Sequence, residues 1–416
     1  MSAVAAPSPA ATAPPAAPVT CGLAVALLTY NNAATVGAVA EAARAGLEKY
    51  FGGVPPALVN VDAGSSDATP DLVAAAGLPV VTLAHAARAV ERIAVPYHGV
   101  PGREAALRAA LERARGLQAR ALLVLEADVA SVTPEWVERL VRPVWEDEAA
   151  LVMPVHARHR YDGTLTSLVL VPVVRALFGR RWHQPLGGAF ALSAGLLGAL
   201  LDDPGWPAGL HEGVEVWMLG TASASGLPVA EAHVGPRRVT SRTRAADLPS
   251  MVAQTVGAVF AVMDRYEDLW LGRRGGTPVS TFGERVAPGS EPAPVDAERM
   301  VHAFEHGLRE LASLWEHILA PDTLGDVLSL VTPVAGAFRF PDELWARVVY
   351  DFALGYRYRV VHRDHLLRSL VPLYLGRAAA HVLASRADDD ARTAARLDAL
   401  GAVFERLKPY LVERWR

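Results

Sequence analysis

Between residues 22 and 155 the chain alternates between short, almost wholly apolar runs and longer helical stretches. The apolar runs comprise residues 22–29, 57–61, 121–125 and 150–155. Their length and apolar character predict buried strands, and the stretch at 35–50 predicts a helix. Strands that alternate with helices in this way indicate an α/β fold.

The first two strands each end in a small polar loop, at residues 30–32 and 62–69. Two strand–loop–helix units of this kind predict a nucleotide-binding half-sheet. Asp62 can accept hydrogen bonds from a base or ribose edge. The serine and aspartate residues at 65–67 are typical caps for the helix that follows.

A third strand ends abruptly in two acids, Glu126 and Asp128, before a helix that Thr133-Pro-Glu-Trp136 opens. Residues spaced i and i+2 on a strand point the same way. Ligands bind at the carboxyl ends of strands in α/β sheets, and two hard oxygen ligands there suit a divalent cation that holds a diphosphate. The alternative is an ordinary strand end whose acids face water.

Strands and helices continue beyond residue 155, with a helix to about Phe178, a loop at 180–188 and a helix from Glu212 to about Gly226. After about residue 247 the pattern is helical only, apart from a Gly/Pro-rich loop at 272–296. We therefore expect three parts: a disordered Ala/Pro-rich tail, an α/β domain and a helical C-terminal domain. Their expected bounds are residues 1–20, 21–246 and 247–416.

The composition of the 416 residues suits an enzyme: 51% are hydrophobic, and the net charge of -4 gives no case for a nucleic-acid surface. The single cysteine, Cys21, excludes a disulfide framework. The only lysines are Lys49 and Lys408, so anion recognition falls to arginine, whose guanidinium grips carboxylate and phosphate bidentately.

The N-terminal tail has no basic start and no continuous apolar core, so it does not read as a signal peptide. The most apolar later stretch, residues 165–178, is too short to span a membrane and carries Arg175. A cytoplasmic location is the expectation.

Several motifs together resemble those of mannosylglycerate synthases and glucosyl-3-phosphoglycerate synthases, which are glycosyltransferases of the GT-A fold. They are Glu126-Ala-Asp128 with Thr133-Pro-Glu-Trp136, Gln184-Pro-Leu-Gly-Gly188, Gly213-Val-Glu215, Pro101-Gly102-Arg103, Leu344-Trp-Ala-Arg, Tyr350-Asp-Phe and Pro372-Leu-Tyr-Leu-Gly-Arg377. The resemblance implies a GT-A domain with a helical C-terminal region. It also implies a retaining transfer of a hexose from a GDP- or UDP-sugar to glycerate or a phosphoglycerate, with Mg²⁺ or Mn²⁺ on the diphosphate.

The same resemblance implies roles for individual residues. The expected catalytic residues are Asp128, Glu215 and Gly187, with Asp128 and Glu126 as metal ligands. The expected donor-binding residues are Thr29, Tyr30, Asn31, Asp62, Arg103, Glu126, Gln184, Leu186 and Gly188. Paired glycines also occur in tight structural turns. Glu215 alternatively acts as a first-turn acid that the helix dipole stabilises.

An acidic acceptor requires a cation and polar groups, and Arg158, Asp162 and Thr166 are spaced four apart, on one face if the segment is helical. Arg158 can fork onto a carboxylate, while Asp162 and Thr166 suit hydroxyl groups. The three positions also resemble acceptor-binding residues of the same family. The alternative is a solvated helix start that Asp162 caps.

The chain departs from the family pattern at the predicted metal site. Val239 stands where the family has a histidine ligand, Arg103-Glu104-Ala105 replaces Lys-Gly-Asp, and Ala189 replaces an acid. Three hypotheses follow: an active transferase with a reduced metal site, a binding protein for nucleotide-sugar or an acidic metabolite, and a nucleotidyltransferase. The third ranks last because the loop at 30–35 contains no glycine.

The C-terminal region carries His302 and His306 one helical turn apart, a spacing that suits zinc, although packed or solvated histidines are commoner. Its aromatic residues are expected to pack the helices onto the first domain or onto a second subunit. A homodimer is compatible with either arrangement.

Overall fold

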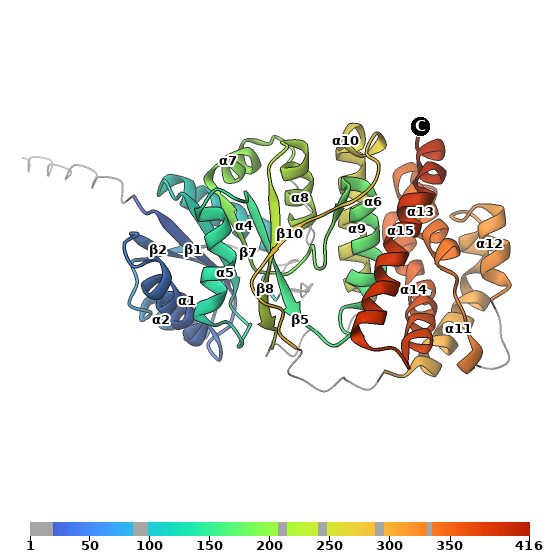
Figure 1. The fold of residues 1–416 in the computed structure, drawn as a ribbon, viewed down its shortest axis with the longest axis horizontal. Coiled ribbons are helices and arrows are strands. Elements are labelled where there is room, and N and C mark those ends of the chain that lie inside the picture. The colour runs from blue at the N-terminus through green and yellow to red at the C-terminus, as the bar shows by residue number, and fades with distance from the viewer. Residues whose placement is uncertain (1–19, 86–98, 207–213, 240–247, 288–294, 331–334) are drawn as a thin grey trace, which may run out of the picture.

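The computed structural model describes residues 20–85, 99–206, 214–239, 248–287, 295–330 and 335–416. Nearly all of the predicted tail at 1–20 lies outside the described residues. So do Gly213 and the predicted domain boundary at 246–247. The description below concerns the remaining chain, which is drawn in colour in Figure 1.

An eight-stranded sheet forms the centre of the α/β part, in the order β10-β8-β5-β7-β4-β1-β2-β3. Its strands are β1 (Leu23–Thr29), β2 (Pro56–Asp62), β3 (Val80–Ala84), β4 (Ala121–Glu126), β5 (Leu151–Ala157), β7 (Phe190–Ser193), β8 (Val229–Pro236) and β10 (Ser280–Phe282). Strand β7 pairs antiparallel with β4 and β5, whereas the other pairings are parallel. The predicted α/β fold is confirmed.

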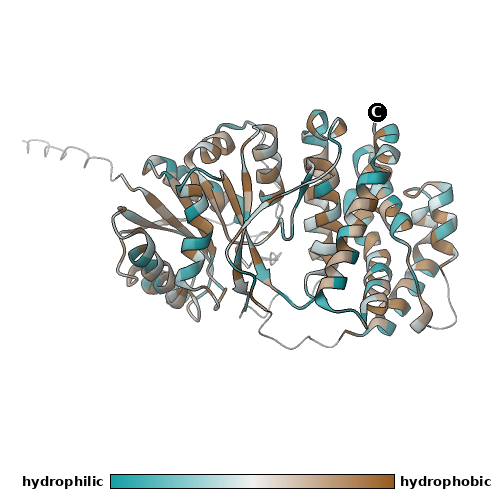
Figure 2. Ribbon diagram, viewed as in Figure 1, coloured by the Kyte–Doolittle hydropathy of each residue, from teal (hydrophilic) through white to brown (hydrophobic). Residues whose placement is uncertain are grey.

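Side chains of the central strands alternate between two hydrophobic cores, one on each face of the sheet. In β1, Leu23, Val25 and Leu27 belong to one core, while Ala24 and Ala26 belong to the other. This alternation follows from the two-residue period of a strand. Figure 2 shows the resulting concentration of hydrophobic residues in the central strands.

Helices cover both faces of the sheet. One core includes residues of α1 (Val36–Phe51) and α5 (Pro134–Trp145), and the other includes residues of α4 (Arg103–Gly116), α7 (Ala194–Asp202) and α8 (Val214–Ala224). The short helix α2 (Thr69–Ala74) packs beside α1. The stretch predicted as a helix to about Phe178 consists of a π-helical turn, Thr166–Leu170, followed by α6 (Val171–Phe178).

The C-terminal helices extend the second of these cores. They are α9 (Leu248–Arg265), α10 (Glu267–Leu271), α11 (Ala297–Trp315), α12 (Pro321–Leu328), α13 (Asp342–Tyr358), α14 (Arg363–Ser385) and α15 (Asp390–Trp415), with a 3₁₀ turn at Ala335–Ala337. The predicted loop at 272–296 contains two short strands that the apolar pattern did not indicate. Strand β9 (Thr277–Pro278) pairs with β6 (Arg180–Arg181), and β10 pairs with β8.

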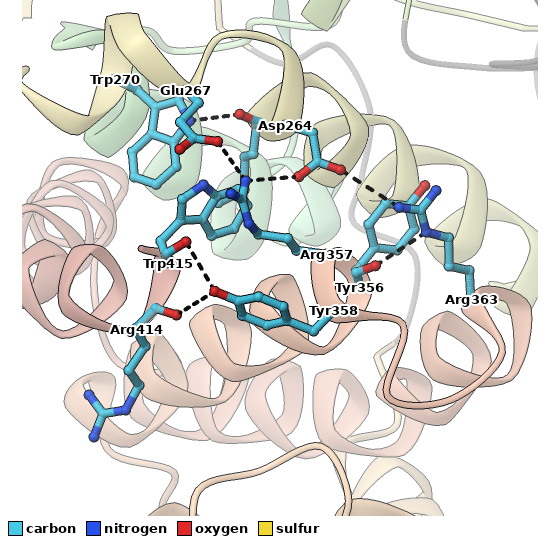
Figure 3. A network of polar contacts seen from close by, with 10 residues as sticks. Asp264, Glu267, Trp270, Tyr356, Arg357, Tyr358, Arg363, Arg414 and Trp415 are labelled. Carbon is cyan, nitrogen blue, oxygen red and sulfur yellow. Dashed lines mark hydrogen bonds and ion pairs between the residues drawn. The ribbon is translucent and has the colours of Figure 1, made fainter.

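Polar contacts join α9 and α10 to α13 and α15 in the helical part of the molecule, between the sheet and α11 and α12 (Figures 1 and 3). Arg357 contacts Glu267 at 2.7 Å and Asp264 at 3.4 Å. The indole rings of Trp270 and Trp415 meet edge to face with centroids 5.0 Å apart. In the described part of the chain, no helix is long and apolar enough to cross a membrane.

Candidate active site

The carboxyl ends of β1 and β4 lie side by side because the two strands pair in parallel. A narrow cleft opens at this edge of the sheet. It is lined by Leu28, Asn32, Val100, Arg103, Val124, Leu125, Glu126, Ala127, Asp128 and Gly188. Four residues predicted for the donor or the metal, namely Arg103, Glu126, Asp128 and Gly188, therefore meet in one place.

Glu126, the first acid of the pair, is largely buried and forms an ion pair with Arg237, which follows β8. Nε of Arg237 donates to Oε2 of Glu126 at 3.0 Å, and Nη2 donates to the same oxygen at 2.5 Å. The carboxylate also lies against Gly188, since a Cβ added there would be 2.3 Å from its Cδ. Gly188 has a φ of +81°, which only glycine adopts readily.

Arg103 and Glu215 form a second ion pair, with 2.7 Å between Nη1 and Oε1 and side chains only 4% and 2% exposed. Arg103 is the first residue of α4, and Glu215 lies in the first turn of α8. Nη2 of Arg103 also donates to the carbonyl of Gly188 at 3.3 Å. Glu215 is therefore an ion-pair partner inside the protein in addition to being a first-turn acid.

The loops after β1 and β2 are tied to each other beside the cleft. Oδ1 of Asp62 accepts from the amides of Gly64 and Ser65 at 3.0 and 2.8 Å, and its Oδ2 lies 2.9 Å from the Thr29 hydroxyl. Oδ1 of Asn31 accepts from the amide of Ser66 at 2.8 Å. The side chains of Thr29, Asn31 and Asp62 thus organise the backbone of a predicted nucleoside-binding edge.

The helix α2 begins after Ala68, which has no side chain that can cap it. Of the residues at 65–67 expected to cap the helix, Asp67 does contact its start, because its Oδ1 accepts from the amide of Thr69 at 3.0 Å. Its Oδ2 also accepts from the amide of Ala33 at 3.0 Å, so Asp67 links this loop to the loop after β1. Tyr30 packs partly buried against the hydrophobic core.

A cavity of about 420 Å³ lies at the same edge of the sheet, beyond the end of β5. Its walls include the three predicted acceptor residues and Gln184. They also include residues that were not among the predicted site residues: Val155, His156, Ala157, His159, Arg160, Gly163, Ser167, His183, His233, Gly235, Arg285, Val286, Asp390, Thr393, Ala394 and Leu397. The last four come from α15, so the C-terminal region closes one side of the cavity.

Arg158, Asp162 and Thr166 share this cavity, but the helical face expected to bring them together is wrong. Residues 158–163 form turns, and the helix begins only at residue 164. The Oδ2 of Asp162 accepts from the amide of His159 at 3.2 Å, and Gly163 has a φ of +67°. The Arg158 guanidinium lies over Gly163, where a Cβ would be 2.8 Å from Nη1, so a folded turn replaces the helical turn.

The loop from His183 to Gly188 connects the cavity to the cleft. Gln184 donates from Nε2 to the carbonyl of His156 at 2.8 Å and accepts from its amide at 3.2 Å. A Cβ on Gly187 would be 2.2 Å from Pro154, so this glycine permits close packing against β5. Leu186 packs on the hydrophobic core. Gly187 and Gly188 likewise lie against the protein's own residues, Pro154 and Glu126.

His156 is the second-last residue of β5, beneath this loop, and was not predicted as a site residue. Its Nε2 lies 3.1 Å from the carbonyl of Gly187, which can only accept, so Nε2 carries the proton. Burial lowers the pKa of His156 to about 3, which keeps the ring neutral. Both His156 and Arg237 lie at the carboxyl end of a strand, β5 and β8 respectively. This position is the feature of the sequence from which they could have been predicted as site residues.

Val239 lies opposite Val129 in an antiparallel bridge, directly beside the predicted metal ligand Asp128. The segment in which the family pattern has a histidine therefore lies beside Asp128, but here it carries Val239, whose side chain cannot bind a metal. No cluster of three or more His, Cys, Asp or Glu residues suited to a metal occurs in the described residues. Of the two acids predicted as metal ligands, Glu126 is engaged by Arg237, and Asp128 lines the same cleft.

The C-terminal histidines show no metal site within the described ranges. His302 is exposed and lies 3.4 Å from Glu305 on the same helix, an arrangement typical of a solvated helix face. This observation favours the alternative to zinc binding.

The fold is a mixed α/β fold, in which a mostly parallel sheet presents the cleft and the cavity at the carboxyl ends of its strands. No family model matches the sequence, and no curated protein matches it either. Among solved structures, glucosyl-3-phosphoglycerate synthase from Mycobacterium tuberculosis with Mn²⁺, uridine diphosphate and glucosyl-3-phosphoglycerate is 25% identical. Its TM-score is 0.45, over 59% of this chain and 80% of that chain.

A second structure of that enzyme, with Mn²⁺, uridine diphosphate and phosphoglyceric acid, is 27% identical at a TM-score of 0.45, over 59% of this chain and 78% of that chain. A third, with Mg²⁺ and uridine diphosphate, is 24% identical at the same TM-score, over 59% and 80% of the two chains. These structures belong to the group that the motifs resemble. A similarity of this extent assigns no ligand or activity to the present chain.

Proposed function

We propose that the chain is a glycosyltransferase that moves a hexose from a nucleotide-sugar to a hydroxyl group of a small acid such as glycerate or 3-phosphoglycerate. The observation that supports this is the loop at 183–188. His183 and Gln184 line the large cavity, whereas Gly188 lines the strand-end cleft. A transfer requires the donor and acceptor sites to adjoin, and this loop borders both the cavity and the strand-end residues predicted to bind the donor.

On the donor side, the loops after β1 and β2 receive the nucleoside, with Thr29, Asn31 and Asp62 supporting the backbone that contacts it. A divalent cation, Mg²⁺ or Mn²⁺, neutralises the diphosphate when bound, with Asp128 as its protein ligand. Arg237 and Arg103 add positive charge at the same edge of the sheet. Electrostatic stabilisation of the leaving diphosphate is then the main contribution to the rate.

On the acceptor side, Arg158 binds the carboxylate, and Asp162 and Thr166 hydrogen-bond the hydroxyl groups. The bond between the anomeric carbon and the diphosphate oxygen breaks, and a bond from the acceptor hydroxyl oxygen to that carbon forms. The hydroxyl proton passes to the departing diphosphate. Attack from the leaving group's side retains the anomeric configuration, so this mechanism needs no separate protein base.

A nucleotide-sugar or acidic-metabolite binding protein with little turnover is the second candidate. The Arg237–Glu126 ion pair favours it, because an acid already neutralised by arginine contributes less to a metal site. Val239 beside Asp128 favours it for the same reason.

Calorimetric titration tests the donor site first. UDP, UDP-glucose and GDP-mannose are each titrated with Mn²⁺ and with EDTA, followed by a transfer assay with glycerate and 3-phosphoglycerate. We expect one nucleotide to bind, and Asp128→Asn to abolish the metal-dependent part of its affinity. Binding without any transfer supports the second candidate, and no binding of any nucleotide contradicts both.

Arg158→Ala tests the acceptor site in the same assay. The acceptor KM should rise at least tenfold while the donor KM changes little, because a charged hydrogen bond to a carboxylate is lost. Arg108→Ala is the matched control, since Arg108 is a half-exposed arginine of α4 that pairs with Glu112. Equal changes in both KM values contradict the assignment of Arg158 to the acceptor.

A further inference from the structure

Glu231 of β8 is a fully buried carboxylate whose hydrogen bonds come from the start of the 183–188 loop. The His183 amide donates to its two oxygens at 2.9 and 3.0 Å, and the Gln184 amide donates at 2.7 Å. The ring Nδ1 of His183 lies 2.8 Å from Oε2. A buried carboxylate with these donors determines where the loop starts.

The His183 ring is held by Glu231 and yet remains 64% exposed on the cavity wall. Because the carboxylate accepts at Nδ1, the other ring nitrogen, Nε2, lies on the side of the ring away from Glu231. The hydrogen bond that Nδ1 makes to the Glu231 carboxylate raises the pKa of His183, while partial burial and the nearby Arg285 oppose that rise.

The other charged and titratable groups around His183 come from β8 and from the segment after β10. The His233 ring lies 6.5 Å from the His183 ring, and burial lowers the pKa of His233, so His183 is the stronger base of the two. Arg285 is exposed at the cavity rim. A guanidinium and an imidazole ring with an outward ring nitrogen therefore stand together on one side of the cavity, and both can donate hydrogen bonds to an anion.

We propose that His183, positioned by Glu231 on the cavity wall, binds a second anionic group of the acceptor, beyond the carboxylate assigned to Arg158. This inference rests on the proposed function and narrows its acceptor class to hydroxy acids that carry a further anion, such as a phosphate. His183 is then a specificity residue and Glu231 a positioning residue. Protonation of His183 makes acceptor affinity fall as the pH rises through the pKa of this ring.

Histidine side-chain NMR and steady-state kinetics test the proposal on the full chain. In the wild-type protein we expect 3-phosphoglycerate to shift the His183 resonances and to raise its pKa further, and glycerate to do neither. His183→Gln should raise the KM for 3-phosphoglycerate about tenfold and leave the KM for glycerate within twofold, because one charge-assisted hydrogen bond is lost. The wild-type KM for 3-phosphoglycerate should rise from pH 6 to pH 8.5, and that rise should be absent in the variant.

Glu231→Gln should lower the pKa of His183 towards its ordinary value and reproduce the KM effect at pH 7.5 but not at pH 5.5. Glu231 lies in the core. If Glu231→Gln does not fold, the results for His183→Gln, which changes a residue on the cavity wall, test the proposal by themselves. The control is His302→Gln, which removes an exposed histidine also paired with a glutamate, on α11. It should change neither KM value.

The outcomes separate this inference from the proposed function. If 3-phosphoglycerate is a substrate but His183→Gln raises both acceptor KM values equally or not at all, the inference is overturned and the transferase stands. If neither acceptor reacts, the proposed function fails, and titration with inorganic phosphate, followed by the His183 resonances, tests the anion site alone. Phosphate that shifts the His183 resonances supports anion binding, and phosphate that leaves them unchanged overturns it.

Discussion

Ion pairs in two parts of the molecule differ in burial and therefore in what they contribute to stability. Beside the strand-end cleft, which we call the sheet edge, Arg103 and Glu215 are 4% and 2% exposed. Where α10 meets α13, which we call the helix junction, Glu267 and Arg357 are 32% and 25% exposed (Figure 3). An exposed pair is screened by water and contributes about 0–1 kcal/mol. A buried pair loses the hydration of two charges, which its own attraction offsets only in good geometry.

The comparison indicates why each pair is present. At the helix junction, hydrophobic burial of Trp270 and Trp415 holds the helices together, and the arginine contacts add little. At the sheet edge, apolar residues of the same volume in place of Arg103 and Glu215 would lose no hydration of charge on folding. We therefore expect that this ion pair serves ligand binding and not stability. Four predictions test this contrast.

Breaking the buried pair should have the largest effect. Arg103→Met removes the arginine from a carboxylate that is only 2% exposed and should lower the free energy of unfolding by about 3–5 kcal/mol, as measured by urea denaturation. The double variant Arg103→Met/Glu215→Leu should recover most of this loss but fail to bind the nucleotide. A loss below about 1 kcal/mol in the single variant contradicts the buried-pair assignment.

Exchanging the cation at the strand end should have the next largest effect. Arg237→Gln combined with Val239→His releases Glu126 from its ion pair and adds an imidazole near Asp128. Binding of UDP, measured by calorimetry, should then depend on Mn²⁺ about tenfold more than in the wild type. Arg238→Gln, at the neighbouring exposed arginine, is the control. An unchanged ratio of the Mn²⁺ and EDTA affinities means that Arg237 does not substitute for metal charge.

Lys408 is a buried cation that donates to the carbonyls of Ala176 and Arg273 at 2.8 and 2.7 Å. Burial lowers its pKa to about 8, so between pH 8 and its ordinary pKa the unfolded chain holds a proton that the folded chain has lost. This group destabilises the fold below pH 8, and the penalty disappears as the pH rises to about 10.5.

The difference in unfolding free energy between wild type and Lys408→Met should therefore change between pH 7.5 and 9.5 in favour of the wild type. Its slope should stay below about 1.4 kcal/mol per pH unit, the value for one whole proton. Lys49→Met, at the exposed lysine that pairs with Glu135, should show no such slope. A pH-independent difference for Lys408→Met contradicts the lowered pKa.

Removing an exposed ion pair should have the smallest effect. Arg357→Gln should lower the free energy of unfolding by less than about 1 kcal/mol, and added salt should diminish the difference. Thermal unfolding at low and high salt measures both. If Arg357→Gln lowers the free energy of unfolding as much as Arg103→Met does, the exposed and the buried ion pair do not differ in their contribution to stability.

Local patterns were enough to predict much of the framework. The strands that end at Thr29, Asp62 and Glu126 were predicted because short apolar runs between polar loops have few alternatives. The α/β class follows from their alternation with helices. Strand β10 was not predicted, because three residues in a Gly/Pro-rich loop become a strand only when β8 offers them an edge.

The ligand spaces were predicted less completely. The acids at β4 and the acceptor residues were found from spacing and resemblance, and the structure brings each set to a cleft or cavity. The helical face expected for Arg158 and Asp162 was wrong, since a turn at Gly163 places them instead. The metal, donor and acceptor roles of these residues stay predictions.

The sequence by itself determined the apolar runs that form β1, β2, β4 and β5, because side-chain periodicity and turn chemistry act over a few positions. Strands β3, β7 and β8 of the same sheet were not predicted. Only the tertiary structure decided that Arg237 neutralises Glu126, that Arg103 meets Glu215 and that Glu231 holds His183. These pairs are separated by about 50 to 110 positions. Such contacts depend on how strands are ordered in the sheet, and no local pattern encodes that order.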